Sequence, residues 1–228
     1  MLEPVPGVFM LERTWGSNIY IIGDYDPVLI DAGFPLDERR IIKSLGGAVP
    51  SLMVATHYHI DHVGPLASLN RKFGSPVAAH SEDAEVMEGT VPYQVFKLGP
   101  LRAVYYKILA PLYRYEFVPV EMKLEEGDVI DSLGGLEVIC LPGHTDGSIA
   151  LYQRERGILF SGDTIRNEKD ILDGPPPQFT PELDEAFEHI KAKVLPLEID
   201  VLLPGHGEPL VGGASAGIRS MLAEKGRL

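Results

Sequence analysis

Cysteine, positive charge and long apolar runs are all scarce in this sequence of 228 residues. Cys140 is the only cysteine, which excludes an intrachain disulfide and predicts a reducing, cytoplasmic setting. The 20 Lys and Arg residues face 33 Asp and Glu, a formal net charge of −13. This balance disfavours nucleic acid or an anionic membrane as a partner, because both require clustered positive charge. No apolar run approaches the roughly 20 residues of a spanning helix, and the start, MLEPVPGVFML, lacks the pattern of a signal peptide.

Short apolar runs alternate with helical patterns along the whole chain, and we expect one domain over 1–228 with an apolar content, 45%, that is ordinary for a globular core. Strands are predicted at 17–23, 27–31, 51–55, 76–79, 134–141, 148–152, 157–161 and 201–203. Helices are predicted at 36–45, 66–73, 81–87 with Ser81 as N-cap, 181–194 and 214–224. Because strands precede helices in two similar half-chains, we expect α/β layers around two sheets.

One segment, from about 89 to 119, differs in character and is interpreted as a partly helical insertion. It holds seven aromatic residues: Tyr93, Phe96, Tyr105, Tyr106, Tyr113, Tyr115 and Phe117. Tyrosines offer an apolar face with a polar tip, so Tyr105 and Tyr113 are candidates for contacting a substrate under a lid. The alternative is that the aromatic residues pack the insertion onto the domain or form a homodimer contact.

A dense group of metal-ligating side chains follows the apolar run at 51–55. Within six residues the sequence places His57, His59, Asp61 and His62, in an expected strand-to-helix loop. Burying three imidazoles and a carboxylate together without a cation would leave costly unsatisfied groups. Zinc accepts such nitrogen and oxygen ligands, commonly three from the protein in a catalytic site. The segment therefore predicts a metal centre.

Three further candidate ligands each follow an apolar strand and stand beside a glycine. They are His144 in Pro-Gly-His-Thr, Asp163 in Ser-Gly-Asp-Thr and His206 in Pro-Gly-His-Gly. Glycine lets the backbone turn tightly, so each strand can deliver its ligand to a shared edge. Structural zinc sites are usually closed and rich in cysteine, whereas seven His and Asp ligands for two metals leave open positions. The pattern favours catalysis.

The ordered series His-x-His-x-Asp-His, Gly-His-Thr, Gly-Asp-Thr and Gly-His, spanning 57–206, resembles the motifs of the metallo-β-lactamase superfamily. The resemblance implies an αββα sandwich, with two central mixed β-sheets and helices on both outer faces. It implies two divalent ions, expected as Zn²⁺ with iron or manganese as alternatives. One ion would be held by His57, His59 and His144, the other by Asp61, His62 and His206, with Asp163 bridging both. Asp31, in Leu-Ile-Asp-Ala-Gly, would support the ligand loop from behind.

The activity that this resemblance implies is hydrolysis of a small carboxylic ester, lactone or thioester by a hydroxide that bridges the two metals. Two metals can lower the pKa of a shared water from 15.7 toward about 7, and Asp61 is the expected proton carrier. A phosphoesterase or phosphotriesterase using the same centre is an alternative. A second alternative is an oxidoreductase resembling persulfide dioxygenases, with one iron on His57, His59 and His144.

Particular residues of this sequence distinguish it from several subgroups of the superfamily. Too few residues follow His206 for the C-terminal helical region of glyoxalase II, which disfavours a glutathione thioester. Lactonases that resemble this chain carry a catalytic Tyr three residues after the bridging Asp, where this sequence has Arg166. A guanidinium forms two parallel hydrogen bonds with a carboxylate or phosphate, so Arg166 is a candidate substrate contact. The alternative is that Arg166 lies at the surface or in a salt bridge. Cys140 is expected to be a small core residue.

Overall fold

Two β-sheets packed face to face form the centre of the protein, which we describe from a computed structural model over residues 1–23, 25–93 and 115–228. The seven-stranded sheet has the order β1-β2-β3-β4-β5-β6-β7 and the six-stranded sheet the order β15-β14-β11-β10-β9-β8. Buried side chains from both sheets meet in one cluster, where the ring of Tyr20 packs edge-on against Phe160 with ring centroids 5.3 Å apart. Burial of these inner faces is the main force that holds the two half-chains together.

The seven-stranded sheet is built from the N-terminal half of the chain. Its strands are β1 (Leu2–Val5), β2 (Val8–Met10), β3 (Tyr20–Ile22), β4 (Val28–Ile30), β5 (Leu52–Val54), β6 (Val77–His80) and β7 (Met122–Leu124). Pairing is antiparallel from β1 to β4 and parallel from β4 to β7. Alternate side chains point to opposite faces, so Ile21 joins the outer cluster while Tyr20 and Ile22 join the inner one.

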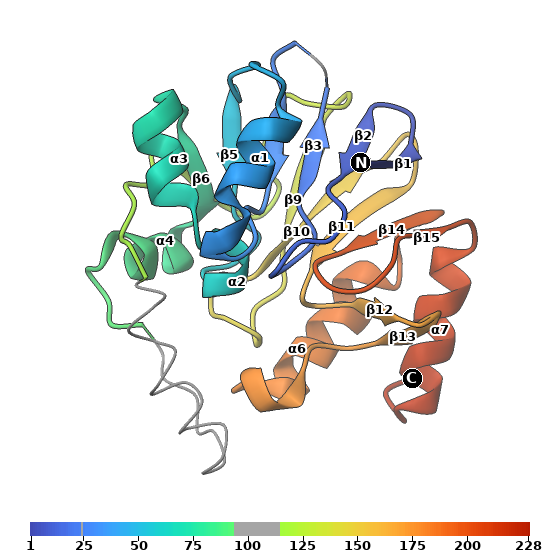
Figure 1. The fold of residues 1–228 in the computed structure, drawn as a ribbon. Coiled ribbons are helices and arrows are strands. Elements are labelled where there is room, and N and C mark those ends of the chain that lie inside the picture. Colours follow the sequence, from blue (N-terminus) through green and yellow to red (C-terminus); the bar gives the residue numbers. More distant parts are fainter. Residues whose placement is uncertain (24, 94–114) are drawn as a thin grey trace.

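Helices cover the outer face of this sheet (Figure 1). They are η1 (Pro35–Asp37), α1 (Glu38–Ser44), α2 (Ile60–Val63), α3 (Leu66–Phe73) and α4 (Ser81–Glu88). Buried residues such as Ile41 of α1, Leu69 of α3 and Met87 of α4 pack with Met53 of β5 in a second core cluster.

The six-stranded sheet repeats this arrangement with the second half of the chain. Its strands are β8 (Val129–Ile130), β9 (Leu136–Cys140), β10 (Ile149–Gln153), β11 (Ile158–Gly162), β14 (Val201–Pro204) and β15 (Leu210–Val211), with a separate hairpin of β12 (Arg166–Glu168) and β13 (Ile171–Asp173). Only the β11–β14 pairing is parallel within this sheet. Its outer face is covered by α6 (Leu183–His189), the π-helical turn η4 (Ile190–Val194) and α7 (Ala214–Glu224), and the short η3 (Pro177–Phe179) precedes α6 in the chain.

The predicted αββα sandwich with two mixed sheets is confirmed, while several local predictions were wrong. Asp61 and His62 lie on the single-turn helix α2 and not in a loop. The cap of α4 is His80, whose Nδ1 accepts from the backbone N–H of Glu82 at 3.3 Å, so Ser81 is already inside the helix. The helix expected at 181–194 changes to π-helical geometry at Ile190.

The insertion predicted at 89–119 is described only at its two ends. Tyr93 packs against Tyr115 and against Tyr58, with ring centroids 5.0 and 5.3 Å apart. Tyr105 and Tyr113, together with the helical content expected for this segment, lie outside the described residues, so the lid and the homodimer contact stay predictions, as does the single domain. The described part of the chain contains no helix with the length and apolar character of a membrane span.

We expect Leu151→Ala to lower the free energy of unfolding by about 2–5 kcal/mol, because it removes a fully buried side chain from the cluster between the sheets. Urea unfolding followed by circular dichroism measures this. Val129→Ala, at a position 64% exposed, is the matched control and should change stability by less than about 0.5 kcal/mol. A loss below about 1 kcal/mol for Leu151→Ala would show that the inter-sheet cluster is not tightly packed.

Candidate metal centre

The candidate ligands converge at one edge of the sandwich because the strands that precede them end there. His57 follows β5, His144 lies between β9 and β10, Asp163 follows β11 and His206 follows β14. Since β11 and β14 are parallel, their carboxyl ends deliver Asp163 and His206 to the same place. Residues up to 149 positions apart in sequence therefore become neighbours in space.

The first group consists of His57, His59 and His144, all buried. Nε2 of His57 lies 3.0 Å from Nδ1 of His59 and 3.3 Å from Nε2 of His144. The candidate ligand atoms of the three residues lie within 4.8 Å of one another. Three imidazole nitrogens thus face a common point.

The second group consists of Asp61, His62 and His206 and is more open. Nε2 of His206 lies 3.3 Å from Nε2 of His62 and 3.3 Å from Oδ2 of Asp61. His62 is fully buried, whereas the side chains of His206 and Asp61 are 28% and 38% exposed. Solvent and a substrate can therefore approach from the side of Asp61.

Asp163 lies between the two groups and directs one oxygen to each. Its Oδ1 is 3.2 Å from Nε2 of His62 and 3.4 Å from Nε2 of His206, and its Oδ2 is 3.6 Å from Nε2 of His144. The side chain is only 6% exposed, and Oδ1 makes no hydrogen bond of good geometry with any described residue. A buried carboxylate oxygen in this state is unusual unless a cation supplies the missing interaction.

Asp31 lies beside His62, on the side away from the other candidate ligands of its group. Its Oδ2 lies 2.7 Å from Nδ1 of His62, and its Oδ1 accepts from the backbone N–H of Thr56 at 2.8 Å. The residue adopts a left-handed conformation, φ 55°, which turns the chain sharply after β4 and aims the carboxylate at His62. A hydrogen bond from Nδ1–H to a carboxylate leaves Nε2 of His62 to face the other ligands.

Two threonines that the sequence reading missed orient two more imidazoles. The Thr56 hydroxyl donates to Oδ2 of Asp31 at 2.9 Å, so it can accept from Nδ1–H of His57 at 3.1 Å. The Thr180 hydroxyl donates to the carbonyl of Pro176 at 2.8 Å, so it can accept from Nδ1–H of His144 at 3.0 Å. Both rings then present an unprotonated Nε2 to the centre.

These tautomers provide a test of whether a metal fits. With the protons on Nδ1, the lone pairs of His57 Nε2 and His144 Nε2 face each other across 3.3 Å, which is unfavourable without a cation between them. Two nitrogens bound to zinc at 2.0–2.1 Å with tetrahedral geometry lie about 3.4 Å apart, close to this spacing. Burial lowers the pKa of His144 to about 4, so its ring is neutral and able to bind near pH 7. The residues fit a divalent cation.

Glycines beside the ligands allow the close packing of the centre. A Cβ on Gly205 would lie 2.7 Å from Oδ1 of Asp163 and 2.8 Å from Cε1 of His62. A Cβ on Gly162, whose φ is +51°, would lie 2.9 Å from Cβ of Thr56. Neither contact leaves room for a larger residue.

The remaining residues singled out from the sequence lie in other surroundings. The Arg166 guanidinium contacts Glu168 at 2.6 Å and Asp173 at 3.5 Å, and its Nε donates to the carbonyl of Gly174 at 3.0 Å. These contacts lie in and next to the β12–β13 hairpin, and a substrate contact of Arg166 stays a prediction. Cys140 is half-buried at the end of β9, and burial raises the pKa of its thiol to about 12, so it is a poor nucleophile near pH 7.

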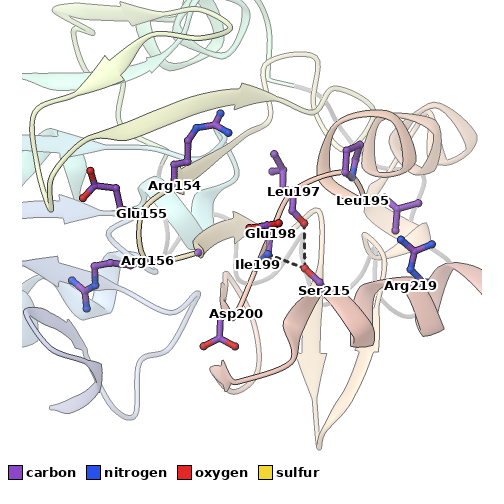
Figure 2. A pocket seen from close by; sticks show the side chains of 12 residues that line it. Arg154, Glu155, Arg156, Leu195, Leu197, Glu198, Ile199, Asp200, Ser215 and Arg219 are labelled. Carbon is purple, nitrogen blue, oxygen red and sulfur yellow. Dashed lines mark hydrogen bonds between the residues drawn. The ribbon is translucent and has the colours of Figure 1, made fainter.

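A separate cleft of about 610 Å³ lies at the opposite end of the strands (Figure 2). It opens beside Gly157 and Asp200, which precede β11 and β14, whereas the ligands follow those strands. Its lining includes both arginines and acidic residues, and the Ser215 hydroxyl bonds to the backbone of Leu197 and Ile199. The cleft is therefore remote from the candidate metal centre.

The sandwich and the paired ligand groups define a metal-dependent hydrolase. The chain belongs to the metallo-beta-lactamase superfamily, whose family model matches residues 13–206. It is 30% identical to the probable metallo-hydrolase YflN of Bacillus subtilis, over 86% of this chain and 82% of that one. It is 31% identical to the human acyl-coenzyme A thioesterase MBLAC2, over 88% of this chain and 78% of that one.

More distant proteins share the fold. The chain is 28% identical to the hydroxyacylglutathione hydrolase GloC of Haemophilus influenzae over 68% of each chain. The crystal structure of TTHA1623 in a di-iron-bound form superposes with a TM-score of 0.66 and 27% identity, over 94% of this chain and 97% of that one. The B3 metallo-beta-lactamase BLEG-1, 20% identical, superposes with a TM-score of 0.73 over 93% and 96% of the two chains and shows the shared fold alone.

We expect Asp31→Asn to weaken zinc binding by about 10–100-fold, because the partner of His62 Nδ1–H loses its charge and Thr56 loses part of its anchor. Competition with a chromophoric zinc chelator measures the change. The exposed Asp26→Asn is the control and should leave the affinity as it is in the wild type. Equal affinities for both variants would mean that Asp31 does not support the ligands.

Proposed function

We propose that this protein hydrolyses a small carboxylic ester, thioester or lactone at a centre of two divalent metal ions. The observation that carries the proposal is the pair of three-residue groups, each with ligand atoms within 4.8 Å, joined by the two oxygens of Asp163. His57, His59 and His144 would hold one ion and Asp61, His62 and His206 the other, with Asp163 shared. A bound pair of ions would supply Lewis acidity at the substrate carbonyl and lower the pKa of water between them.

Asp61 is the side chain best placed to move a proton in this scheme. Its Oδ2 lies 3.3 Å from Nε2 of His206, and its side chain is 38% exposed. A carboxylate is ionised near pH 7, so it can accept a proton from the attacking water. The side chain also reaches solvent, on the side from which a substrate can approach. After accepting the proton, Asp61 can donate it to the leaving oxygen or sulfur.

The names of the relatives favour a thioester as the first substrate to test. Both an acyl-coenzyme A thioesterase and a hydroxyacylglutathione hydrolase align over two thirds or more of this chain. Zinc is the proposed ion, because imidazole and carboxylate ligands without cysteine suit a hydrolytic zinc site. The di-iron form of TTHA1623 makes iron the first alternative to measure.

Removal of metal should abolish hydrolysis, and adding back the native ion should restore it. Elemental analysis of protein purified without added metal is expected to give close to two equivalents per chain, since the two groups offer two separate ligand sets. Less than one tightly bound equivalent would contradict the dinuclear centre. One equivalent of iron together with oxygen uptake on a persulfide would instead favour an oxidoreductase.

Asp61→Asn should lower kcat by about 100-fold or more, because an amide cannot accept the proton. Rates on an acyl thioester, nitrophenyl acetate, a lactone and a phosphotriester, measured with saturating metal, rank the substrate classes in the same experiment. The exposed Asp131→Asn is the control and should keep wild-type rates. Fastest turnover of the phosphotriester would replace the ester hydrolase with a phosphoesterase.

A further inference from the structure

Asp83, on the outer helix α4, is a buried acidic residue for which neither the sequence motifs nor the proposed chemistry accounts. It is 1% exposed, and its carboxylate accepts three hydrogen bonds. Oδ2 accepts from the backbone N–H of Tyr58 and from the hydroxyl of Thr145, each at 2.9 Å, and Oδ1 accepts from the backbone N–H of Gly147 at 2.8 Å. All three donors belong to two loops.

Those two loops carry the first ligand group. Tyr58 stands between His57 and His59 in the loop after β5, and Thr145 directly follows His144 in the loop between β9 and β10. The first loop belongs to the seven-stranded sheet and the second to the six-stranded sheet. The carboxylate therefore joins the ligands of one group across the boundary between the two sheets.

The contact is close enough to fix the distance between the loops. A Cβ on Gly147 would lie 2.6 Å from Oδ1 of Asp83, so only glycine permits this approach. Thr145 is also held by Ser148, whose hydroxyl lies 2.7 Å from the Thr145 hydroxyl. Burial raises the pKa of Asp83 to about 7, although its three hydrogen-bond donors lower it.

The second ligand group has a different support. The Asn18 side-chain amide donates to the carbonyls of Pro204 at 2.9 Å and Gly207 at 2.8 Å, on either side of His206. The backbone N–H of Ser17 donates to the carbonyl of Asp61 at 2.8 Å. Because separate residues support the two groups, loss of one supporting residue should change the metal affinity of one group more than that of the other.

We propose that Asp83 is a positioning residue that sets the spacing of His57, His59 and His144, and thereby the metal affinity of that group alone. The inference rests on the proposed metal centre. Asp83 acts through the backbone of Tyr58 and the side chain of Thr145.

The test measures zinc affinity in two backgrounds, each with one group disabled. In His206→Ala the first group is intact, and adding Asp83→Asn should weaken zinc binding by about 10–100-fold, as loss of a supporting hydrogen bond does at metal sites. In His144→Ala the second group is intact, and adding Asp83→Asn should change the affinity by less than about twofold. Competition with a chromophoric chelator gives both constants without any activity assay.

Asp37→Asn is the matched control. Asp37 is as buried as Asp83 and also accepts from three donors, here the backbone N–H groups of Trp15, Gly16 and Phe34. In the His206→Ala background it should lower thermal stability as Asp83→Asn does while leaving zinc affinity unchanged. If Asp83→Asn fails to fold, Thr145→Val removes one of the three hydrogen bonds with nearly the same shape and should weaken the first group in the same selective way.

Several results would overturn the inference. Equal weakening in the two backgrounds, or equal weakening by Asp37→Asn, would mean that Asp83 only stabilises the fold. Unchanged affinity for Asp83→Asn, while the wild type binds two ions, would remove the positioning role and leave the metal centre intact. If neither the wild type nor His206→Ala bound zinc or another divalent ion, the proposed centre would fail, and the role of Asp83 with it.

Discussion

The arrangement of this protein depends on bringing several lone pairs of electrons to one place. Hydrogen bonds to Thr56, Thr180 and Asp31 direct the Nε2 atoms of three imidazoles inward, where they lie 3.2–3.6 Å from Asp163 or from one another. Without a cation the lone pairs on Nε2 of His57 and His144 repel across 3.3 Å, and the burial of these polar groups costs free energy. A bound cation reverses the sign of this interaction, so metal binding and correct folding of the edge stabilise each other.

The sandwich can sustain such a site because its stability comes from elsewhere. The inner cluster between the sheets and the two outer clusters under the helices are apolar and lie along the strands. The candidate ligands lie beyond the strand ends, in loops and on the single-turn helix α2, where glycines such as Gly205 and Gly162 let the chains approach closely. The rigid sheets hold these loops, so ligands from both halves of the chain keep their spacing.

The difference in exposure between the two groups bears on chemistry. The first group is closed and braced by Asp83, whereas Asp61 and His206 of the second group reach solvent. A substrate approaching from that side meets the carboxylate best placed for proton transfer. The same asymmetry explains why a hydrolytic role fits better than a purely structural one, since structural metal sites are closed on all sides.

The fold class and the candidate ligands could be predicted from the amino-acid pattern alone. Apolar runs followed by glycine and His or Asp are local signals, and each placed its residue at a strand end. The residues that support these ligands could be found only from the folded chain, because Asp83 and Thr145 are 62 positions apart and Thr180 and His144 are 36 apart. The same holds for the short strands β1, β2, β7, β8 and β15, which are two to four residues long and are defined by pairing with a neighbour more than by their own pattern. The seven candidate ligands form two neighbouring groups only because contacts between distant parts of the chain bring them together, and a local sequence pattern does not encode such contacts.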